Sequence, residues 1–313
     1  MEKISNRVKG KLSALISFLG LLILVLFFQI VTTGNLLTAN NLLLIVKQGY
    51  ALLIASLAGV FVVATGNLDF SIGAVAGFSC VCATLTATNI SPWLSVPAAV
   101  MVGLGIGLLN GFAQNVLRLP SFIACLCMMF ILMAATQSLI TGNSIMMPVA
   151  MMNWDNNTVK IIFGILYVTV MVVLFRYTRL GKQLKALGVS TEAARQSGVN
   201  VSGMMTFAYA LTGAAAGIAG FFLMLRTGGA ATTTGQTLTT DVIIAIVFGG
   251  MSIAGGATSK IGAAILGTLI VTVLNNGMVL AGYGGDAQQL VKGLLFLAII
   301  AVSIKRDANT IIK

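Results

Sequence analysis

The strongest constraint on this chain is a series of long apolar runs, of which Leu12 to Val31 is the first. That run has the roughly 20 residues that a helix needs to cross a hydrocarbon core of about 30 Å. Inside lipid the backbone must satisfy its own hydrogen bonds, which only helices and closed barrels achieve. Because a barrel strand needs only about 10 residues, runs of this length predict an all-α integral membrane protein.

Composition excludes a water-soluble fold. Of 313 residues, 58% are hydrophobic and 8% are charged, and the mean hydropathy is +1.02, whereas soluble domains contain about 25% charged residues. The formal net charge of +11 does not indicate nucleic-acid binding, because the basic residues occur in short segments between apolar runs instead of along one face. Membrane topology explains them better.

Ten candidate spans follow from apolar runs bounded by Gly, Pro and polar residues. They are 12–31, 42–65, 71–88, 93–112, 121–140, 160–177, 203–225, 241–257, 260–281 and 288–304. The first is expected to be a retained span, because it is too long for the core of a signal peptide and no clear small-residue cleavage site follows it. The chain, residues 1–313, is therefore expected to form a single transmembrane domain.

The basic residues segregate to one side of this topology. With a cytoplasmic amino terminus, the inner segments hold fourteen of the 18 Lys and Arg residues. They are Lys3, Arg7, Lys9, Lys11, Arg118, Arg176, Arg179, Lys182, Lys185, Arg195, Lys260, Lys305, Arg306 and Lys313. Lys160 and Arg226 fall on the outer side, and Lys47 and Lys292 lie within spans. Since cytoplasmic loops are rich in Lys and Arg, both termini are expected in the cytoplasm.

The residues that catalysis usually requires are scarce. The chain has seven acidic residues, no histidine and no close pair of acids along the sequence, which disfavours a membrane enzyme. No phosphate-binding loop of the G-x-x-x-x-G-K-[ST] type is present. Four cysteines form two C-x-C pairs inside apolar runs, where thiols usually act as small hydrophobic groups, and no metal site or cofactor is expected. Any soluble activity must come from partner proteins.

The segment Thr178 to Val201 is the most informative inner segment. Ser190 can cap a short helix of about two turns, Glu192 in its first turn suits the positive end of the helix dipole, and Gly198 can end the helix in a left-handed conformation. One interpretation is a solvated loop whose basic residues set the topology. The other is a small helix that another protein approaches closely, as a mechanical link to a motor subunit requires.

Several motifs resemble those of ABC-importer permeases of the ribose, xylose and galactose type. The coupling region of that family is similar to Thr178 to Val201. The family's entry to its second span is similar to Leu37 to Gln48, and its T-G-G-I-D-L-S-V-G motif is similar to Thr65 to Gly73 (T-G-N-L-D-F-S-I-G). Its G-x-x-N-G…P-x-F-I pattern is matched by Asn110-Gly111 with Pro120, Phe122 and Ile123, and its G-G-T-S-x-x-G-G motif is similar to Phe248 to Gly256 (F-G-G-M-S-I-A-G-G). Two later sites of the family are similar to Leu274 to Gly277 and Lys292-Gly293. The resemblance covers roughly residues 35 to 305. Departures at Asn67, Met251 and Ala257-Thr258 bear on substrate or partner preference.

The resemblance implies a non-catalytic, multi-pass permease subunit in the bacterial cytoplasmic (inner) membrane. Expected partners are cytoplasmic ABC ATPase subunits, a periplasmic or lipid-anchored sugar-binding protein, and a second permease copy or paralogue. Within the cytoplasmic coupling segment, 178–201, the expected ATPase-coupling residues are Gly181, Leu187, Gly188, Glu192, Ala193, Ala194 and Gly198. Residues expected along the translocation path or gate are Asn67, Asp69, Ser71, Asn110, Phe122, Gly249, Gly250, Ser252, Asn275, Asn276 and Lys292.

Simpler structural roles remain open for several of these residues. Asp69 or Ser71 can merely cap the helix that follows, and the glycines at 249–256 can serve close helix packing instead of lining a path. Lys47 and Lys292 can extend their ammonium groups to the membrane interface. Alternatively, Lys292 can pair with Asp286 or Asp241 and stabilise an outer gate.

The expected function is ATP-driven import of a monosaccharide by alternating access. A neutral, hydroxyl-rich cargo fits the scarcity of charge in the spans. Permeases for branched-chain amino acids, nucleosides or a furanone-type sugar derivative are the nearest alternatives. An ion-driven secondary transporter is a different class, and it would require acidic or histidine relays deep in the spans, which the sequence lacks beyond Asp69 at a link.

Overall fold

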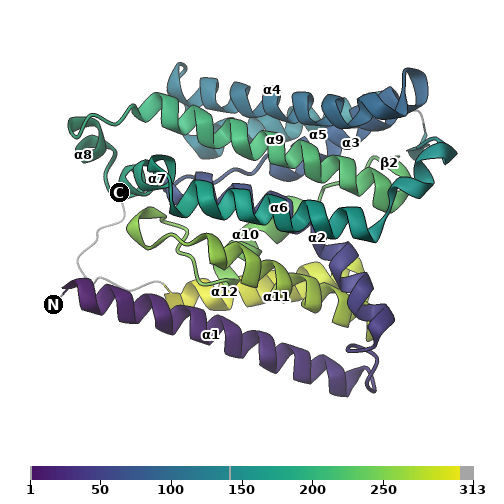
Figure 1. The fold of residues 1–313 in the computed structure, drawn as a ribbon, viewed down its shortest axis with the longest axis horizontal. Helices are drawn as coiled ribbons and strands as arrows, with labels where there is room; N and C mark the ends of the chain where they lie inside the picture. Colours follow the sequence, from purple (N-terminus) through teal and green to yellow (C-terminus); the bar gives the residue numbers. More distant parts are fainter. Residues whose placement is uncertain (1, 141, 304–313) are drawn as a thin grey trace.

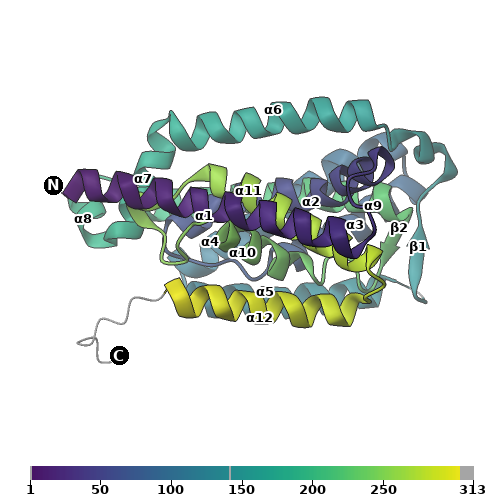
Figure 2. The same ribbon diagram turned by 90° about the horizontal axis from the view of Figure 1, so that it is seen from below.

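The chain folds into a bundle of long helices (Figures 1 and 2). The computed structural model describes residues 2–140 and 142–303, with side chains described for 15–140 and 142–298. The helices are α1 (Glu2–Val31), α2 (Ala39–Ala64), α3 (Ile72–Asn89), α4 (Ser95–Asn115), α5 (Ser121–Leu139), α6 (Asn157–Arg176), α7 (Arg179–Val189), α8 (Thr191–Gln196), α9 (Val201–Thr227), α10 (Leu238–Phe248), α11 (Ile261–Leu280) and α12 (Gly285–Ser303). The all-α prediction is confirmed.

Within the described residues, seven helices are long and apolar enough to cross a membrane: α2, α3, α4 with its preceding 3-10 turn, α5, α6, α9 and α11. Shorter apolar helices are Leu15–Val31, within α1, and α10. Each of the ten predicted spans contains helix in this part of the chain. Residue 304 at the end of the last predicted span, and Lys305, Arg306 and Lys313, lie outside the described residues.

The predicted span 241–257 is wrong in its extent. The helix there, α10, has 11 residues, which at 1.5 Å per residue is about 16 Å, roughly half of a hydrocarbon core. The apolar run continues to residue 257, but Gly250, Gly255 and Gly256 take left-handed backbone conformations that a helix cannot contain. Hydropathy alone therefore extended the predicted helix through residues that instead form a tight loop between α10 and α11 (the inner loop).

A short antiparallel strand pair closes the end of the bundle that lies opposite α7 and α8. It joins β1 (Ser144–Met146), before α6, to β2 (Gly229–Ala231), after α9, with Ile145 opposite Ala230. Trp93 and Trp154 pack at the same end, with ring centroids 4.6 Å apart. In Figure 1, β2 lies at the right and α8 at the left, so the polar connections gather at the two ends of the long helices.

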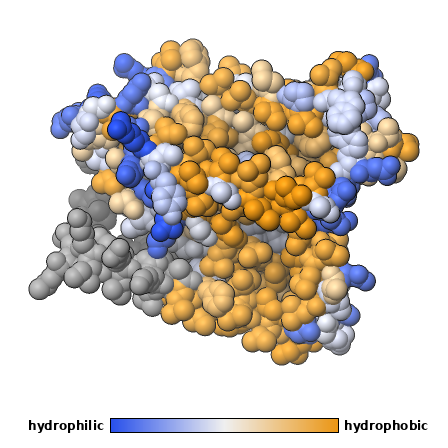
Figure 3. Space-filling view, viewed as in Figure 1, coloured by the Kyte–Doolittle hydropathy of each residue, from blue (hydrophilic) through white to orange (hydrophobic). Residues whose placement is uncertain are grey.

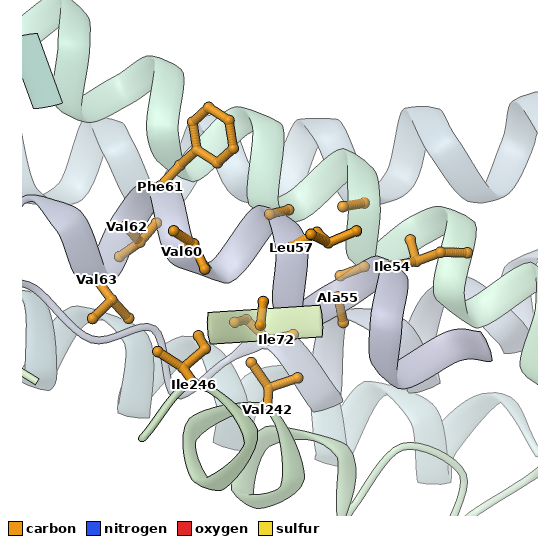
Figure 4. Packing of buried hydrophobic residues seen from close by; sticks show 14 of the residues in the cluster. Ile54, Ala55, Leu57, Val60, Phe61, Val62, Val63, Ile72, Val242 and Ile246 are labelled. Carbon is orange, nitrogen blue, oxygen red and sulfur yellow. The ribbon is translucent and has the colours of Figure 1, made fainter. Parts of the chain in front are cut away.

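Helix α2 forms the centre of the main core. Nearly all of its residues from Gly49 to Ala64 are buried, and Phe61 packs edge-to-face against Phe175 of α6 with ring centroids 5.1 Å apart. Figure 4 shows Val242 and Ile246 of α10 facing Ile72 of α3 and Val60 of α2. The short helix α10 is thus held inside the bundle, with most of its residues buried.

Helices α4 and α9 approach each other through glycines. A Cβ atom added to Gly103 would lie 2.8 Å from the backbone nitrogen of Gly217, and one added to Gly107 would lie 3.0 Å from Cα of Ala210. Real Cβ atoms essentially never come closer than 3.0 Å to such backbone atoms. Small residues four apart let helix backbones approach in membranes, where van der Waals packing replaces the hydrophobic effect between helices.

The exposed apolar side chains agree with a bundle that crosses a membrane. Large apolar side chains are exposed on α1, α5 and α6, among them Ile23, Phe130, Ile131 and Ile162. Figure 3 shows a broad hydrophobic zone across the middle of the molecule, with hydrophilic residues gathered at the two ends. Exposed apolar area of this extent is unstable in water and is satisfied by lipid, so the molecule is built to cross a bilayer with its long helices.

Candidate functional site

The predicted coupling segment forms two helices at one end of the bundle. The capping prediction is confirmed: Ser190 Oγ accepts a hydrogen bond of 3.2 Å from the Ala193 amide at the start of α8, and Gly198 has φ +80°. Glu192 and Arg195 form an exposed ion pair of 3.0 Å. The sequence prediction missed α7, an amphipathic helix of 11 residues that precedes α8 and whose apolar residues at 184 and 187 follow helical spacing.

The structure divides the seven predicted coupling residues into two groups. Gly181, Leu187, Gly188 and Ala194 face the bundle and are buried or half-buried. At Gly188 any side chain would collide with the backbone of Ala64 and of Gly256. This group fixes the segment to the ends of α2 and α9 and is turned away from a partner.

The other group, Glu192, Ala193 and Gly198, is exposed on α8. Next to it, Lys185 of α7 places its ammonium group 4.6 Å from the centre of the Phe175 ring. Burial, and then the nearby Arg176 charge, lower the pKa of Lys185. The surface at this end therefore combines a small alanine with charged groups, which suits contact with another protein.

Three predicted path residues also lie at this end. Gly249 packs against the backbone of Ala263, while Gly250 and Ser252 are exposed in the loop between α10 and α11. That loop contacts α7 through the 3-10 turn Gly256–Thr258. The structure thus joins these residues to the coupling segment and separates them from the other predicted path residues.

A second group of predicted residues forms a buried polar cluster between α2 and α3. Asp69 Oδ1 accepts hydrogen bonds from the Ser71 amide (2.8 Å) and hydroxyl (2.6 Å), and Asn110 of α4 donates to Ser71 Oγ at 2.8 Å. Burial raises the pKa of the Asp69 carboxyl, and the bonds from Ser71 oppose that rise. Ser71 makes no side-chain cap, so that proposed role is wrong; its hydroxyl links Asp69 to α4 instead.

Two further predicted residues flank this cluster without joining it. Asn67 donates to the Thr65 hydroxyl at 3.0 Å in the same link. Phe122 is 53% exposed and packs edge-to-face on Phe70 with centroids 5.2 Å apart. The contact of Asn67 is local, whereas Phe122 packs from α5 onto the link between α2 and α3.

The third group lies at the end opposite α7 and α8. Asn41 of α2 and Asn276 of α11 exchange two buried amide hydrogen bonds, of 2.9 and 3.0 Å. Lys292 of α12 pairs with Asp241 of α10 at 2.6 Å, and Asn275 donates to the other Asp241 oxygen at 3.3 Å. The predicted pairing of Lys292 with Asp241 is confirmed, and this pair excludes interface snorkelling for Lys292, whose side chain is 4% exposed.

The alternative partner Asp286 is exposed at the start of α12. It precedes Lys292 by six residues, and residues face each other on a helix at spacings of three or four. Local geometry therefore disfavours that pair, while the distant α10 supplies the carboxylate. Lys47, the other lysine within a span, is half-exposed on α2, so its extension to the interface stays a prediction.

A partly open cavity of about 260 Å³ adjoins the Asp241–Lys292 pair and is lined by α2, α9, α10, α11 and α12. The sequence prediction missed several of its polar residues, among them Gln48, Arg226 and Gln289. Gln289 precedes Lys292 by three residues, so the sequence could have predicted that both lie on the same face of one helix. Gln48 and Arg226 come from distant helices, and no local pattern links them.

Comparison with known proteins agrees with these features. Residues 41–300 match the family described as branched-chain amino acid transport system / permease component. The ribose import permease protein of Escherichia coli (strain K12) is 30% identical over 248 residues, covering 75% of this chain and 77% of that protein. The fructose import permease protein of Rhizobium meliloti is 29% identical, over 77% of this chain and 71% of that protein.

The galactofuranose transporter permease protein of Escherichia coli (strain K12) is 27% identical over 296 residues, covering 91% of this chain and 85% of that protein. No solved structure matches the chain with significance.

Proposed function

Because this chain belongs to the family of permease components of branched-chain amino acid transport systems, we propose that it is the membrane-spanning subunit of an ATP-driven importer that carries a monosaccharide into the cytoplasm. The observation that carries this proposal is the match over residues 41–300 together with relatives named for ribose, fructose and galactofuranose. The family description names amino acids, which makes a branched-chain amino acid the second candidate cargo.

The proposed topology has ten spans with both termini in the cytoplasm. Arg176, Arg179, Lys182, Lys185 and Arg195 all belong to the end of the bundle that carries α7 and α8. Since Lys and Arg favour the cytoplasmic side, that end faces inward and the Asp241–Lys292 pair lies toward the outer side. In this arrangement α10 takes part as a half-length span enclosed by protein, which membranes tolerate where lipid does not reach the helix ends.

The proposed partners follow from what the chain lacks. It has no phosphate-binding loop, so ATP hydrolysis belongs to a separate cytoplasmic subunit, which docks on the exposed face of α8. The buried residues Gly181 and Leu187 and the half-buried Gly188 pass its movement to α2 and to the inner loop. A sugar-binding protein delivers the cargo at the opposite end, and a second permease copy or paralogue completes the membrane unit.

Uptake into proteoliposomes tests this function. We expect vesicles that contain this chain, the ATPase subunit and the binding protein encoded beside it to accumulate a labelled monosaccharide only when ATP is supplied to the motor side. Accumulation of labelled leucine in place of a sugar would establish the second candidate. Uptake by the chain alone, driven by a proton or sodium gradient, would exclude the proposal.

A substitution on α8 tests the coupling role. Ala193→Arg is expected to lower ATP-driven uptake by about tenfold, equivalent to roughly 1.4 kcal/mol of lost interaction, because a long side chain blocks close approach of the ATPase. Ala193 is exposed and Arg is a good helix former, so the thermal midpoint of the chain should not change. Co-purification of the ATPase gives the second readout.

The matched control is Ala193→Ser, which stays small and should retain uptake and ATPase binding. Wild-type uptake by the Ala193→Arg complex, with the ATPase still bound, would show that α8 is not the docking helix.

A further inference from the structure

The cavity beside the Asp241–Lys292 pair lies within one copy of the chain, at the end opposite the coupling helices. Five helices line it, and Gln48, Ala51 and Leu52 of α2 form one of its walls. Its volume of about 260 Å³ is just below the roughly 300–1,000 Å³ of pockets for drug-sized ligands. The space therefore suits a solute smaller than a typical drug.

Of the three charged groups that line the cavity in the described part of the chain, Asp241 and Lys292 form an ion pair and Arg226 is a separate cation. Lys292 Nζ lies 2.6 Å from Asp241 Oδ1, and the two side chains are 4% and 11% exposed. Asn275 donates to the second oxygen of Asp241 at 3.3 Å. A pair so arranged presents both a carboxylate acceptor and an ammonium donor to the cavity without a net charge.

Arg226 has unused hydrogen-bonding capacity at the cavity. Its guanidinium reaches the backbone oxygen of Gln48 through one nitrogen at 3.4 Å, which leaves other donors free. Asn275 Oδ1 has no hydrogen-bond partner among the described residues, but it is fully buried and is not reached from the cavity. A hydroxyl group that enters the cavity can therefore accept a hydrogen bond from Arg226.

From this geometry we infer that the cavity is a binding site for a small, neutral, polyhydroxylated solute, formed within a single copy of the chain. The inference rests on the proposed function and locates its cargo. Hydroxyl groups both donate and accept hydrogen bonds, so they can bond to the Asp241–Lys292 pair and to Arg226 at once. The apolar wall that includes Ala51 and Leu52 faces the C–H surface of such a solute.

A zwitterionic amino acid fits the site less well. Its ammonium group would compete with Lys292 for Asp241, the one carboxylate among the described residues that line the cavity, whereas its carboxylate could bond to Arg226 without opening the pair. Removing one partner from a buried ion pair costs about 3–5 kcal/mol, which the new contacts would first have to repay. A hydroxyl group bonds to either side chain while the pair stays closed.

Thiol labelling with substrate protection tests the site. Gln289→Cys, on the cavity wall, is made in a chain whose Cys80, Cys82, Cys125 and Cys127 are replaced by serine, and it is assembled with the ATPase and binding protein in vesicles. The probe is whichever of D-ribose, D-fructose or D-galactose the wild-type vesicles accumulate. At about ten times its Kd, roughly nine-tenths of the sites are occupied, so labelling by a charged thiosulfonate should slow about tenfold.

The matched control is Tyr283→Cys, which is exposed between α11 and α12 and does not line the cavity. Its labelling should not change with the sugar. Thr237→Cys, which lines the cavity beside α10, serves as a second reporter if Gln289→Cys does not assemble. Vesicles that accumulate a sugar while neither cavity cysteine is protected would overturn the site and leave the proposed function standing.

Two other labelling outcomes would also contradict the proposed site. Protection by L-leucine and not by the sugar would show that the solute class is wrong. Equal protection of Tyr283→Cys would assign the effect to a general closure of the outer end and remove the site. Vesicles that accumulate no sugar at all would instead contradict the proposed function.

Discussion

Gly103→Val is expected to prevent α4 and α9 from packing and to abolish the recovery of folded protein. The added Cβ would lie 2.8 Å from the Gly217 nitrogen and 2.9 Å from the Gly217 Cα, and closer still to the carbonyl of Gly213. All three are backbone atoms, so no side chain can rotate away, and the two helices must separate along the longest contact of the bundle. Overpacking that a core can absorb costs about 1–3 kcal/mol, and a clash with backbone exceeds that range.

Gly105→Val is the control for this prediction. Gly105 lies two residues away on the same helix, and an added Cβ meets nothing within 4 Å. Both variants carry the same change in helix propensity, so their difference isolates the contact between α4 and α9. Monodisperse protein by fluorescence-detected size exclusion, and its thermal midpoint in detergent, are the measurements. Equal recovery of both variants would contradict the glycine-mediated packing.

Breaking the Asp241–Lys292 pair should have the second large effect. Asp241→Asn leaves the Lys292 ammonium group buried without a counter-charge, and the loss is expected to be about 3–5 kcal/mol. Lys292→Met leaves the carboxylate unpaired at similar cost. In both variants the remaining charge stays largely buried beside the cavity and has lost its counter-charge.

The double variant Asp241→Asn with Lys292→Met removes both charges and should be more stable than either single variant. Neutral replacements of a buried pair are often tolerated, so the two losses should not add. Thermal unfolding of the four proteins in one detergent measures this coupling. Additive losses would mean that the two side chains do not interact in the folded protein.

The proposed function gives the two ends of the molecule different tasks. At one end, α8 presents a small exposed surface, and α7 fixes that surface to the ends of α2 and of the inner loop. At the other end, Asp241 and Lys292 hold α10 and α12 together beside a polar cavity. Because α10 reaches both the cavity and the inner loop, a shift of this short helix would connect events at the two ends.

Local sequence predicted much of this arrangement. The apolar runs predicted helices because a backbone in lipid must bond within its own segment. Ser190 and Gly198 predicted the start and end of α8 because caps act over three or four residues. The same local reading failed at α10, since hydropathy alone does not register the left-handed glycines that end a helix.

The contacts between distant segments were decided by the tertiary structure. Lys292 had two acidic residues in reach by sequence, and only the packing of α10 against α12 selects Asp241, 51 residues away. Among the seven predicted coupling residues, only the fold separates exposed Ala193 from buried Leu187. Short-range rules of hydrogen bonding and capping determine each helix from its own residues, whereas the helix face that meets a neighbour depends on how all the helices fill space together.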